Sequence, residues 1–154
     1  MTALLLAFQI VLASQPLMLV SEYGTGNLRG FDPETGAEIM LPEDYQPIGG
    51  VPGGADGMVM DVLGRIHVTR EDGTIFRSDV EGQSFALFAT MPGAGQGFFL
   101  LDLTRNESHL YTTRFGATEL YQVALADAEV TVIPGPSTAN RLDGVRRGPD
   151  ERIY

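Results

Sequence analysis

The sequence contains no cysteine and few basic residues. The absence of cysteine excludes a disulfide framework, a thiolate metal site and a cysteine nucleophile. Ten Lys and Arg against twenty Asp and Glu give a formal net charge of -10, which disfavours nucleic acid and anionic membrane surfaces as partners. The Gly-x-Ser-x-Gly and His-Glu-x-x-His signatures are also missing, which removes the commonest motifs of serine hydrolases and zinc proteases.

Glycine and proline, in contrast, are plentiful. The 154 residues include 19 Gly and 9 Pro, so helix-length stretches without a backbone-breaking residue are scarce. This composition favours an all-β fold.

An internal repeat specifies the architecture further. The segment DGVRRGPDERIY, residues 143–154, aligns without a gap on DGMVMDVLGRIH, residues 56–67. The offset equals two periods of about 43 to 44 residues, which is the length of a four-stranded propeller blade. A middle copy, GQGFFLLDLTRNESHLYTTR at residues 95–114, has the same order of glycine, apolar strand, polar turn and second strand. The repeat therefore predicts a β-propeller with about three four-stranded blades.

Turn signals and strand-forming residues continue each copy. The predicted third strands are NLRGFD, TIFRSD and ELYQVA, and the fourth strands are AEIML, SFALFA and AEVTVI. Asp72-Gly73 and DPETG at residues 32–36 are hairpin turn sequences. The innermost strands MVM and FFLL are apolar at successive positions, as expected when neighbouring blades cover both faces of a blade.

Three blades are too few for a ring, because closed propellers have about 4 to 8 blades. The last residues, RIY, match the start of a second strand. We therefore expect an incomplete chain, a fragment of a longer protein that is monomeric at full length. A dimer of half-rings is the alternative.

The first sixteen residues allow two interpretations. An uncharged apolar run from Ala3 to Ala13 is too short to span a bilayer but has the length of a signal-peptide core. This predicts a signal peptide over residues 1–16, a propeller domain over residues 17–154 and a periplasmic or secreted protein. Alternatively, residues 8–22 align without a gap on residues 56–70, which makes residues 8–13 the innermost strand of the first blade and the protein cytoplasmic.

The segment ADGMVMDVLGRIHVTREDGTIFRSDVEG, residues 55–82, resembles the repeat of the senescence-marker-protein/gluconolactonase/regucalcin superfamily and, more loosely, NHL-type propeller repeats. The resemblance rests on Asp-Gly-Met, a short apolar strand, Asp-x-x-Gly-Arg and Gly-x-Ile-x-Arg-x-Asp. It implies a six-bladed ring with one divalent cation, usually calcium, at the mouth of the central channel. The implied activity is hydrolysis of sugar lactones or related esters.

Three residues are candidate ligands of that cation. Asp56 and Asp143 stand where ligand loops of the family enter innermost strands, and Gln96 stands in the intervening blade where lactonases have Asn. Asp143 is also the candidate catalytic residue. The alternative is that each Asp-Gly pair only forms the tight loop into an inner strand, with the Asp accepting backbone hydrogen bonds.

Two functions follow from these alternatives. The first is a metal-dependent hydrolase of small-molecule lactones or esters, in which the cation polarises the carbonyl and positions a water. The second is a non-catalytic propeller that acts as a ligand-binding or protein-binding scaffold. It is motivated by Gln96 and by Phe8-Gln9, which stands where the family has Glu-Gly-Pro.

Neither histidine is expected to be catalytic. His67 occupies the slot that Tyr111 and Tyr154 hold in other copies of the repeat, and His109 occupies the slot of Arg65 and Arg152. Both therefore read as ordinary residues of second strands.

Overall fold

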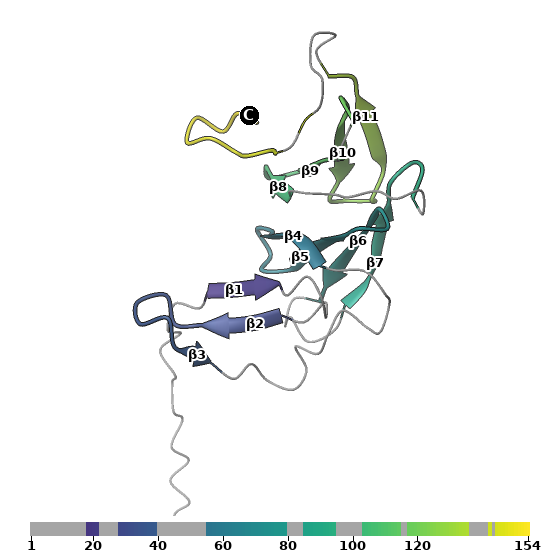
Figure 1. Cartoon of the computed structure of the whole chain (residues 1–154). Helices are drawn as coiled ribbons and strands as arrows, with labels where there is room; N and C mark the ends of the chain where they lie inside the picture. Colours follow the sequence, from purple (N-terminus) through teal and green to yellow (C-terminus); the bar gives the residue numbers. More distant parts are fainter. Residues whose placement is uncertain are drawn as a thin grey trace, which may run out of the picture.

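The structure, a computed structural model, describes residues 18–21, 28–39, 55–79, 85–94, 103–114, 117–135, 142 and 144–154. Every regular element in these ranges is a β-strand (Figure 1). The strands are β1 (Met18–Ser21), β2 (Leu28–Phe31), β3 (Glu38–Ile39), β4 (Ala55–Met60), β5 (Ile66–Arg70), β6 (Thr74–Ser78), β7 (Phe85–Thr90), β8 (Leu103–Arg105), β9 (His109–Thr113), β10 (Leu120–Ala124) and β11 (Val130–Ile133).

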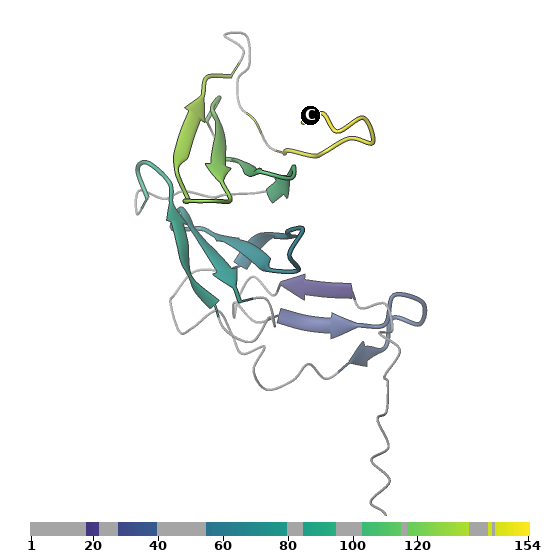
Figure 2. The same ribbon diagram turned by 180° about the vertical axis from the view of Figure 1, so that it is seen from behind.

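The strands form three antiparallel sheets in which each strand pairs with its neighbours in the sequence. The sheets are β1-β2-β3, β4-β5-β6-β7 and β8-β9-β10-β11. They follow one another like blades of a fan, with β4 beside both β1 and β8 (Figures 1 and 2). The predicted all-β fold is confirmed, and the second and third sheets have the predicted four strands. All three predicted third strands and all three predicted fourth strands overlap an observed strand.

The predicted hairpin turns have the expected chemistry. Gly73 has a φ of +84°, and the Asp72 carboxylate accepts a hydrogen bond from the Thr74 N–H at 3.0 Å. In the turn between β2 and β3, Asp32 accepts from the N–H groups of the second and third residues after it, and Gly36 has a φ of +71°. Left-handed backbone of this kind favours glycine, which explains why these two sequences turn where they do.

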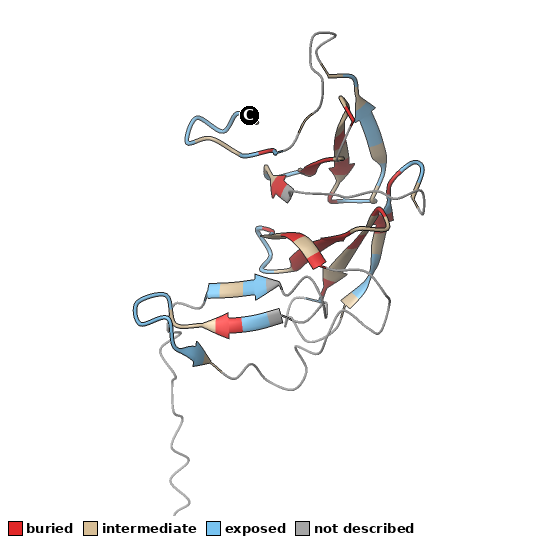
Figure 3. Ribbon diagram, in the orientation of Figure 1, coloured by how far each residue is buried: buried red, intermediate tan, exposed pale blue. Residues whose placement is uncertain are grey.

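The second blade contains many buried residues (Figure 3), and its apolar ones contribute to two cores. One core lies between the second and third blades, and its buried members are Ile75, Ala89, Met91, Leu110, Tyr121, Val123 and Leu125. The other lies between the first and second blades, where Ala55, Ile66 and Val68 are buried and Leu19 packs against them. Successive residues of β4 belong to different cores. Val59 packs against the core between the second and third blades, and Met58 packs against the core between the first and second blades. This explains the apolar run of this inner strand.

The end of the chain opens a fourth copy of the repeat. Arg147 pairs with Ile153 in an antiparallel bridge, as Met60 pairs with Ile66 in the second blade. The Gly148 N–H donates to the Arg152 carbonyl at 2.8 Å, which repeats the bond from Asp61 to Arg65, also at 2.8 Å. Each of these contacts is displaced by the same 87 residues as the sequence match. The predicted repeat register is therefore confirmed here.

Two of the predicted inner strands lie outside the described residues. The described inner strand of the third blade is β8, at Leu103–Arg105, whereas the predicted FFLL at residues 98–101 lies outside the described residues. Residues 8–13, the predicted inner strand of the first blade, also lie outside them.

Candidate functional site

Asp56 lies at the start of the innermost strand of the second blade. The pairing of β4 with β5 shifts between Ala55 and Met58, so Asp56 and Gly57 sit in a β-bulge. Thr69 stabilises this bulge, because its hydroxyl accepts a hydrogen bond from the Gly57 N–H at 2.8 Å and donates to the Gly57 carbonyl at 3.3 Å. Bulges of this kind re-aim a side chain at a strand end. The half-buried Asp56 is thus held at the edge where its strand enters the blade.

The other two predicted ligands, Gln96 and Asp143, lie outside the described residues. Within the residues that the structure describes, no three His, Cys, Asp or Glu side chains gather into a group that could hold a metal ion. The donor chemistry of the nominated set nevertheless fits calcium, because two carboxylates and one amide supply only hard oxygen ligands. Of this set, the structure places Asp56 alone.

A second polar cluster, which the sequence did not point to, lies at the opposite end of β4. Asp61 follows the strand directly, and its side chain is fully buried. One carboxylate oxygen accepts from the N–H groups of Leu63 and Arg65, at 2.9 and 3.0 Å. The other accepts from the Arg65 Nε at 2.7 Å and lies 3.1 Å from the Nε2 of His67. A single carboxylate therefore organises the turn and connects it to the second strand.

The pKa values of this cluster follow from burial and hydrogen bonding. Burial raises the pKa of Asp61, but the hydrogen bonds from His67, from the Arg65 side chain and from two backbone N–H groups outweigh it and lower the pKa to about 2. Burial lowers the pKa of His67, and the hydrogen bond to Asp61 only partly opposes this effect. Asp61 is therefore ionised and His67 neutral at pH 7.

The surroundings of His67 assign it a structural role. An ionised Asp61 requires a proton on Nε2, which leaves Nδ1 as a buried acceptor without a hydrogen-bond partner. The ring packs edge-on against Phe88, with 5.2 Å between the ring centroids. The guanidinium of Arg77 lies over the Phe88 ring, 4.3 Å from its centroid. Because the side chains of Asp61 and His67 have no exposed surface, this acid-histidine pair has no access to a substrate.

Comparable contacts, made from other positions of the turn, occur in the neighbouring copies of the repeat. In the third blade Asn106 donates to the Tyr111 hydroxyl at 2.9 Å, and in the fourth copy the Tyr154 hydroxyl donates to Asp150 at 2.8 Å. A polar residue of the turn thus ties down the second strand each time. The prediction that His67 is an ordinary second-strand residue agrees with this geometry. The signal for Asp61 was present in the sequence as the first residue of Asp-x-x-Gly-Arg.

A groove lies on the same side of the blades as this cluster. It has a volume of about 360 Å³ and runs between the β4–β5 turn and the β8–β9 turn. Val62 and Leu63 line it and are 60% and 61% exposed. Of its two acidic lining residues, Asp61 has a buried, hydrogen-bonded carboxylate and Glu107 is exposed. The groove is therefore mainly apolar and offers little for chemistry.

Solved structures share this fold. Streptogramin B lyase matches with a TM-score of 0.70 and 15% identity, over 93% of this chain and 45% of the lyase. A virginiamycin B lyase from Staphylococcus aureus, solved in a catalytically inactive form with quinupristin, matches with a TM-score of 0.66 and 16% identity, over 91% of this chain and 45% of that one. The extracellular domain of a hybrid two component system from B. thetaiotaomicron gives 0.61 and 16%, over 92% of this chain and 19% of its own.

No family model matches the sequence, and no curated protein matches it either. At about 15% identity the structural likeness establishes the fold alone. Together with the three successive antiparallel sheets, of which the second and third have four strands, it assigns the chain to the β-propeller class. The chain spans less than half the length of the two lyases.

Proposed function

We propose that this protein is a propeller hydrolase that opens small-molecule lactones or related esters. In the proposal a divalent cation lies at the mouth of the central channel, and the oxygen donors of its ligands favour calcium. The observation that carries the proposal is the position of Asp56. It stands on a bulge at the start of an innermost strand, with the local backbone held by Thr69. A cation site shared between blades requires an oxygen donor from several of them, and carboxylates and amides both supply one.

The register of the repeat supports Asp143 as a partner of Asp56. Residues 147 and 153 pair as residues 60 and 66 do, and residues 146 and 154 exchange backbone hydrogen bonds as their counterparts 59 and 67 pair. The sequence match extends this register back to Asp143 as the counterpart of Asp56. Equivalent positions of successive propeller blades face the same central axis. In the proposal, Gln96 of the blade between them contributes its amide oxygen.

Each residue has a defined part in the proposed reaction. Asp56, Gln96 and Asp143 would hold the cation, which when bound supplies polarisation of the ester carbonyl. The carboxylate of Asp143 accepts a proton from the water whose oxygen attacks the carbonyl carbon. The bond from that carbon to the ring oxygen then breaks, and the ring oxygen takes up the proton. The product is an open-chain hydroxy acid.

The solved relatives support a small-molecule substrate. Two are lyases of streptogramin B and virginiamycin B, and one of these was solved with quinupristin. Another solved structure of the same fold is the extracellular domain of a hybrid two component system. The alternative function is a non-catalytic scaffold, and an activity assay has to distinguish it from a hydrolase.

Calorimetry tests the cation site. We expect the chain, freed of metal with a chelator, to bind CaCl₂ with a dissociation constant of about 1 mM or tighter, within the range of extracellular calcium modules. Asp56→Asn and Asp143→Asn should each weaken binding by about tenfold or more, because they keep an oxygen donor and lose a charge. Asp127→Asn is the matched control, since its exposed side chain caps the β10–β11 turn through a bond that asparagine retains. Equal affinity in all four proteins would refute the site.

A panel of sugar and homoserine lactones, followed by acid release at constant pH, tests the reaction. We expect turnover that depends on calcium and is lost in Asp143→Ala but not in Asp127→Asn. Calcium binding without turnover of any lactone would leave a cation-binding scaffold and remove the hydrolase.

The compartment depends on residues 1–16, which lie outside the described residues. Removal of these residues as a leader would place the propeller in the periplasm or outside the cell, in keeping with the extracellular relatives. Retention as a blade strand would place it in the cytoplasm. In the described part of the chain, no helix has the length and apolar character needed to cross a membrane.

A further inference from the structure

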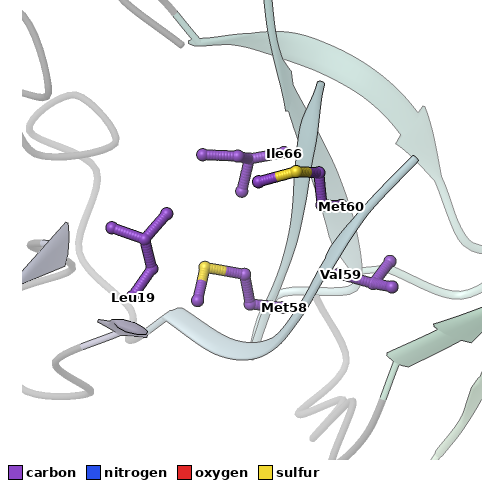
Figure 4. Close-up of a pocket in the computed structure, with 5 residues that line it drawn as sticks. All are labelled: Leu19, Met58, Val59, Met60 and Ile66. Atoms are coloured by element: carbon purple, nitrogen blue, oxygen red, sulfur yellow. The ribbon is translucent and has the colours of Figure 1, made fainter. Parts of the chain in front are cut away.

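An apolar groove lies between the first and second blades. It has a volume of about 210 Å³ and is lined by Leu19, Met58, Val59, Met60 and Ile66. The side chains of Leu19, Met58, Met60 and Ile66 point toward one another across it, whereas Val59 points to the other face of β4 (Figure 4). Met60 is 51% exposed, so the described residues leave this apolar surface incompletely covered.

The first sheet has one described strand fewer than the other two. Its β1 aligns with β5, the second strand of the next blade, and pairs on one edge with β2. The described residues of the first sheet include no counterpart of the inner strands β4 and β8. The core between the second and third blades contains several residues of each blade. In the core between the first and second blades, Leu19 is the one residue that the described part of the first blade contributes.

The repeat identifies what belongs in the groove. Residues 8–22 align without a gap on residues 56–70, so Leu19 corresponds to His67 and Val11 to Val59. In the second blade Val59 pairs directly with His67, and both pack toward the third blade. Leu19 likewise points toward the next blade along, which is the second blade. If residues 8–12 keep this register, Val11 would lie opposite Leu19, on the side of the groove.

We propose that the groove is the seat of the chain's own residues 8–12, paired antiparallel with β1 as the innermost strand of the first blade. The segment FQIVL is apolar at four of its five positions, as the lining requires. The five residues 13–17 match in number the residues 61–65 that connect β4 to β5. Residues 8–12 are then part of the folded propeller and are not removed with a leader.

Disulfide trapping tests the pairing, and the cysteine-free sequence makes it clean. Ile10 is predicted to lie opposite Val20, as Met58 lies opposite Val68. Directly opposed residues of antiparallel strands have Cα atoms about 4.5 to 5.5 Å apart, within reach of a disulfide. The matched control is Ile10→Cys with Met18→Cys, in which the two residues are diagonal and about 7–8 Å apart. Met18 and Val20 are similarly exposed, at 45% and 40%.

We expect mild oxidation to consume both thiols of Ile10→Cys/Val20→Cys within one chain and to leave those of Ile10→Cys/Met18→Cys at least about fivefold more reactive toward a thiol reagent, since the second pair exceeds disulfide geometry. Intact mass should show a chain that still contains residues 8–12. Equal oxidation of both pairs would overturn the proposal, as would a mature chain that begins after Ala13. A disulfide between two chains would assign the groove to a second copy instead.

A substitution without cysteine provides an independent readout. Val11→Asp would place a charge in the apolar groove and should lower the melting temperature by roughly 5–10 °C. Leu4→Asp, in the same apolar run but outside the proposed strand, should leave it unchanged. Equal melting temperatures for the two variants would contradict the proposal.

Discussion

At the scale of single residues, one buried carboxylate of the second blade has four hydrogen-bonding contacts. Asp61 accepts from two backbone N–H groups, from Arg65 and from His67. These charge-assisted hydrogen bonds compensate its burial, which explains a pKa of about 2 in a side chain without exposed surface. His67 stays neutral for the opposite reason, because burial dominates over its one hydrogen bond.

Stability should therefore fall as the pH falls below about 6.5. The pKa of His67 is lowered from 6.5 on folding, so the unfolded chain binds a proton at a pH where the folded chain does not. The stability that the neutral ring contributes is complete above pH 6.5 and is lost below it. The pKa of Asp61 is lowered from 3.8 to about 2, so its contribution is present above pH 3.8 and is lost as the pH falls toward 2.

The variant His67→Tyr should reduce the slope of unfolding free energy against pH between pH 6.5 and 5, by at most about 1.4 kcal/mol per pH unit. Tyrosine does not titrate there, and it holds this slot in the third blade as Tyr111. Urea unfolding at a series of pH values measures the slope, and His109→Gln, which removes the other histidine, is the control. The explanation is wrong if His67→Tyr keeps the wild-type slope or if His109→Gln loses it.

At the scale of elements, the turns decide where each strand ends. Gly64 closes the β4–β5 turn with a φ of +82°, and a Cβ added there would meet no atom within 4 Å. Space is therefore not the constraint at this position. The constraint is the left-handed backbone itself, which costs a residue with a Cβ about 1–2 kcal/mol and costs asparagine less.

We expect Gly64→Ala to lower the free energy of unfolding by about 1 kcal/mol and Gly64→Asn to lower it by clearly less. Urea denaturation of the three proteins at pH 7 gives the order. Since both side chains enter open space, a crowding effect would penalise the larger asparagine more. Alanine as stable as glycine, or more stable than asparagine, would show that the turn does not need the left-handed conformation.

At the scale of the whole molecule, blades are joined at their inner strands. The Arg105 side chain of the third blade donates to the Met60 carbonyl of the second. The Arg147 N–H of the fourth copy donates to the Thr104 hydroxyl of the third at 3.2 Å. These bonds connect segments distant in the sequence and complement the apolar cores between the sheets. Each blade is thus stabilised by the next one.

The variant Thr104→Val removes the acceptor of the Arg147 N–H without changing the volume of the side chain much. We expect the Arg147 amide to exchange hydrogen about five- to tenfold faster, while the amides of β4–β7 keep their rates. Hydrogen exchange with site resolution measures both. The control is Thr131→Val on the exposed face of β11. A similar acceleration in the control, or none in Thr104→Val, would show that this bond does not hold the fourth copy in place.

Much of the fold could be predicted from the sequence, whereas the buried Asp61–His67 contact could not. The strands of the second blade were predictable because Asp72-Gly73, β-branched residues and a blade-length repeat act locally. Of the predicted ligands, Asp56 is placed at the start of an inner strand, as expected. Sequence reasoning missed the Asp61–His67 contact because it joins a residue of the turn to a residue of the following strand. It forms only when the His67 side chain points back toward that turn.

The sequence by itself determined the order of the strands, the period of the blades and the positions of the turns, because each depends on residues close together in the chain. Only the tertiary structure decided which face of each strand is buried and against which blade. It also decided that His67 is enclosed and that an apolar groove is left beside β1. These properties depend on which segments stack, and stacking joins residues tens of positions apart.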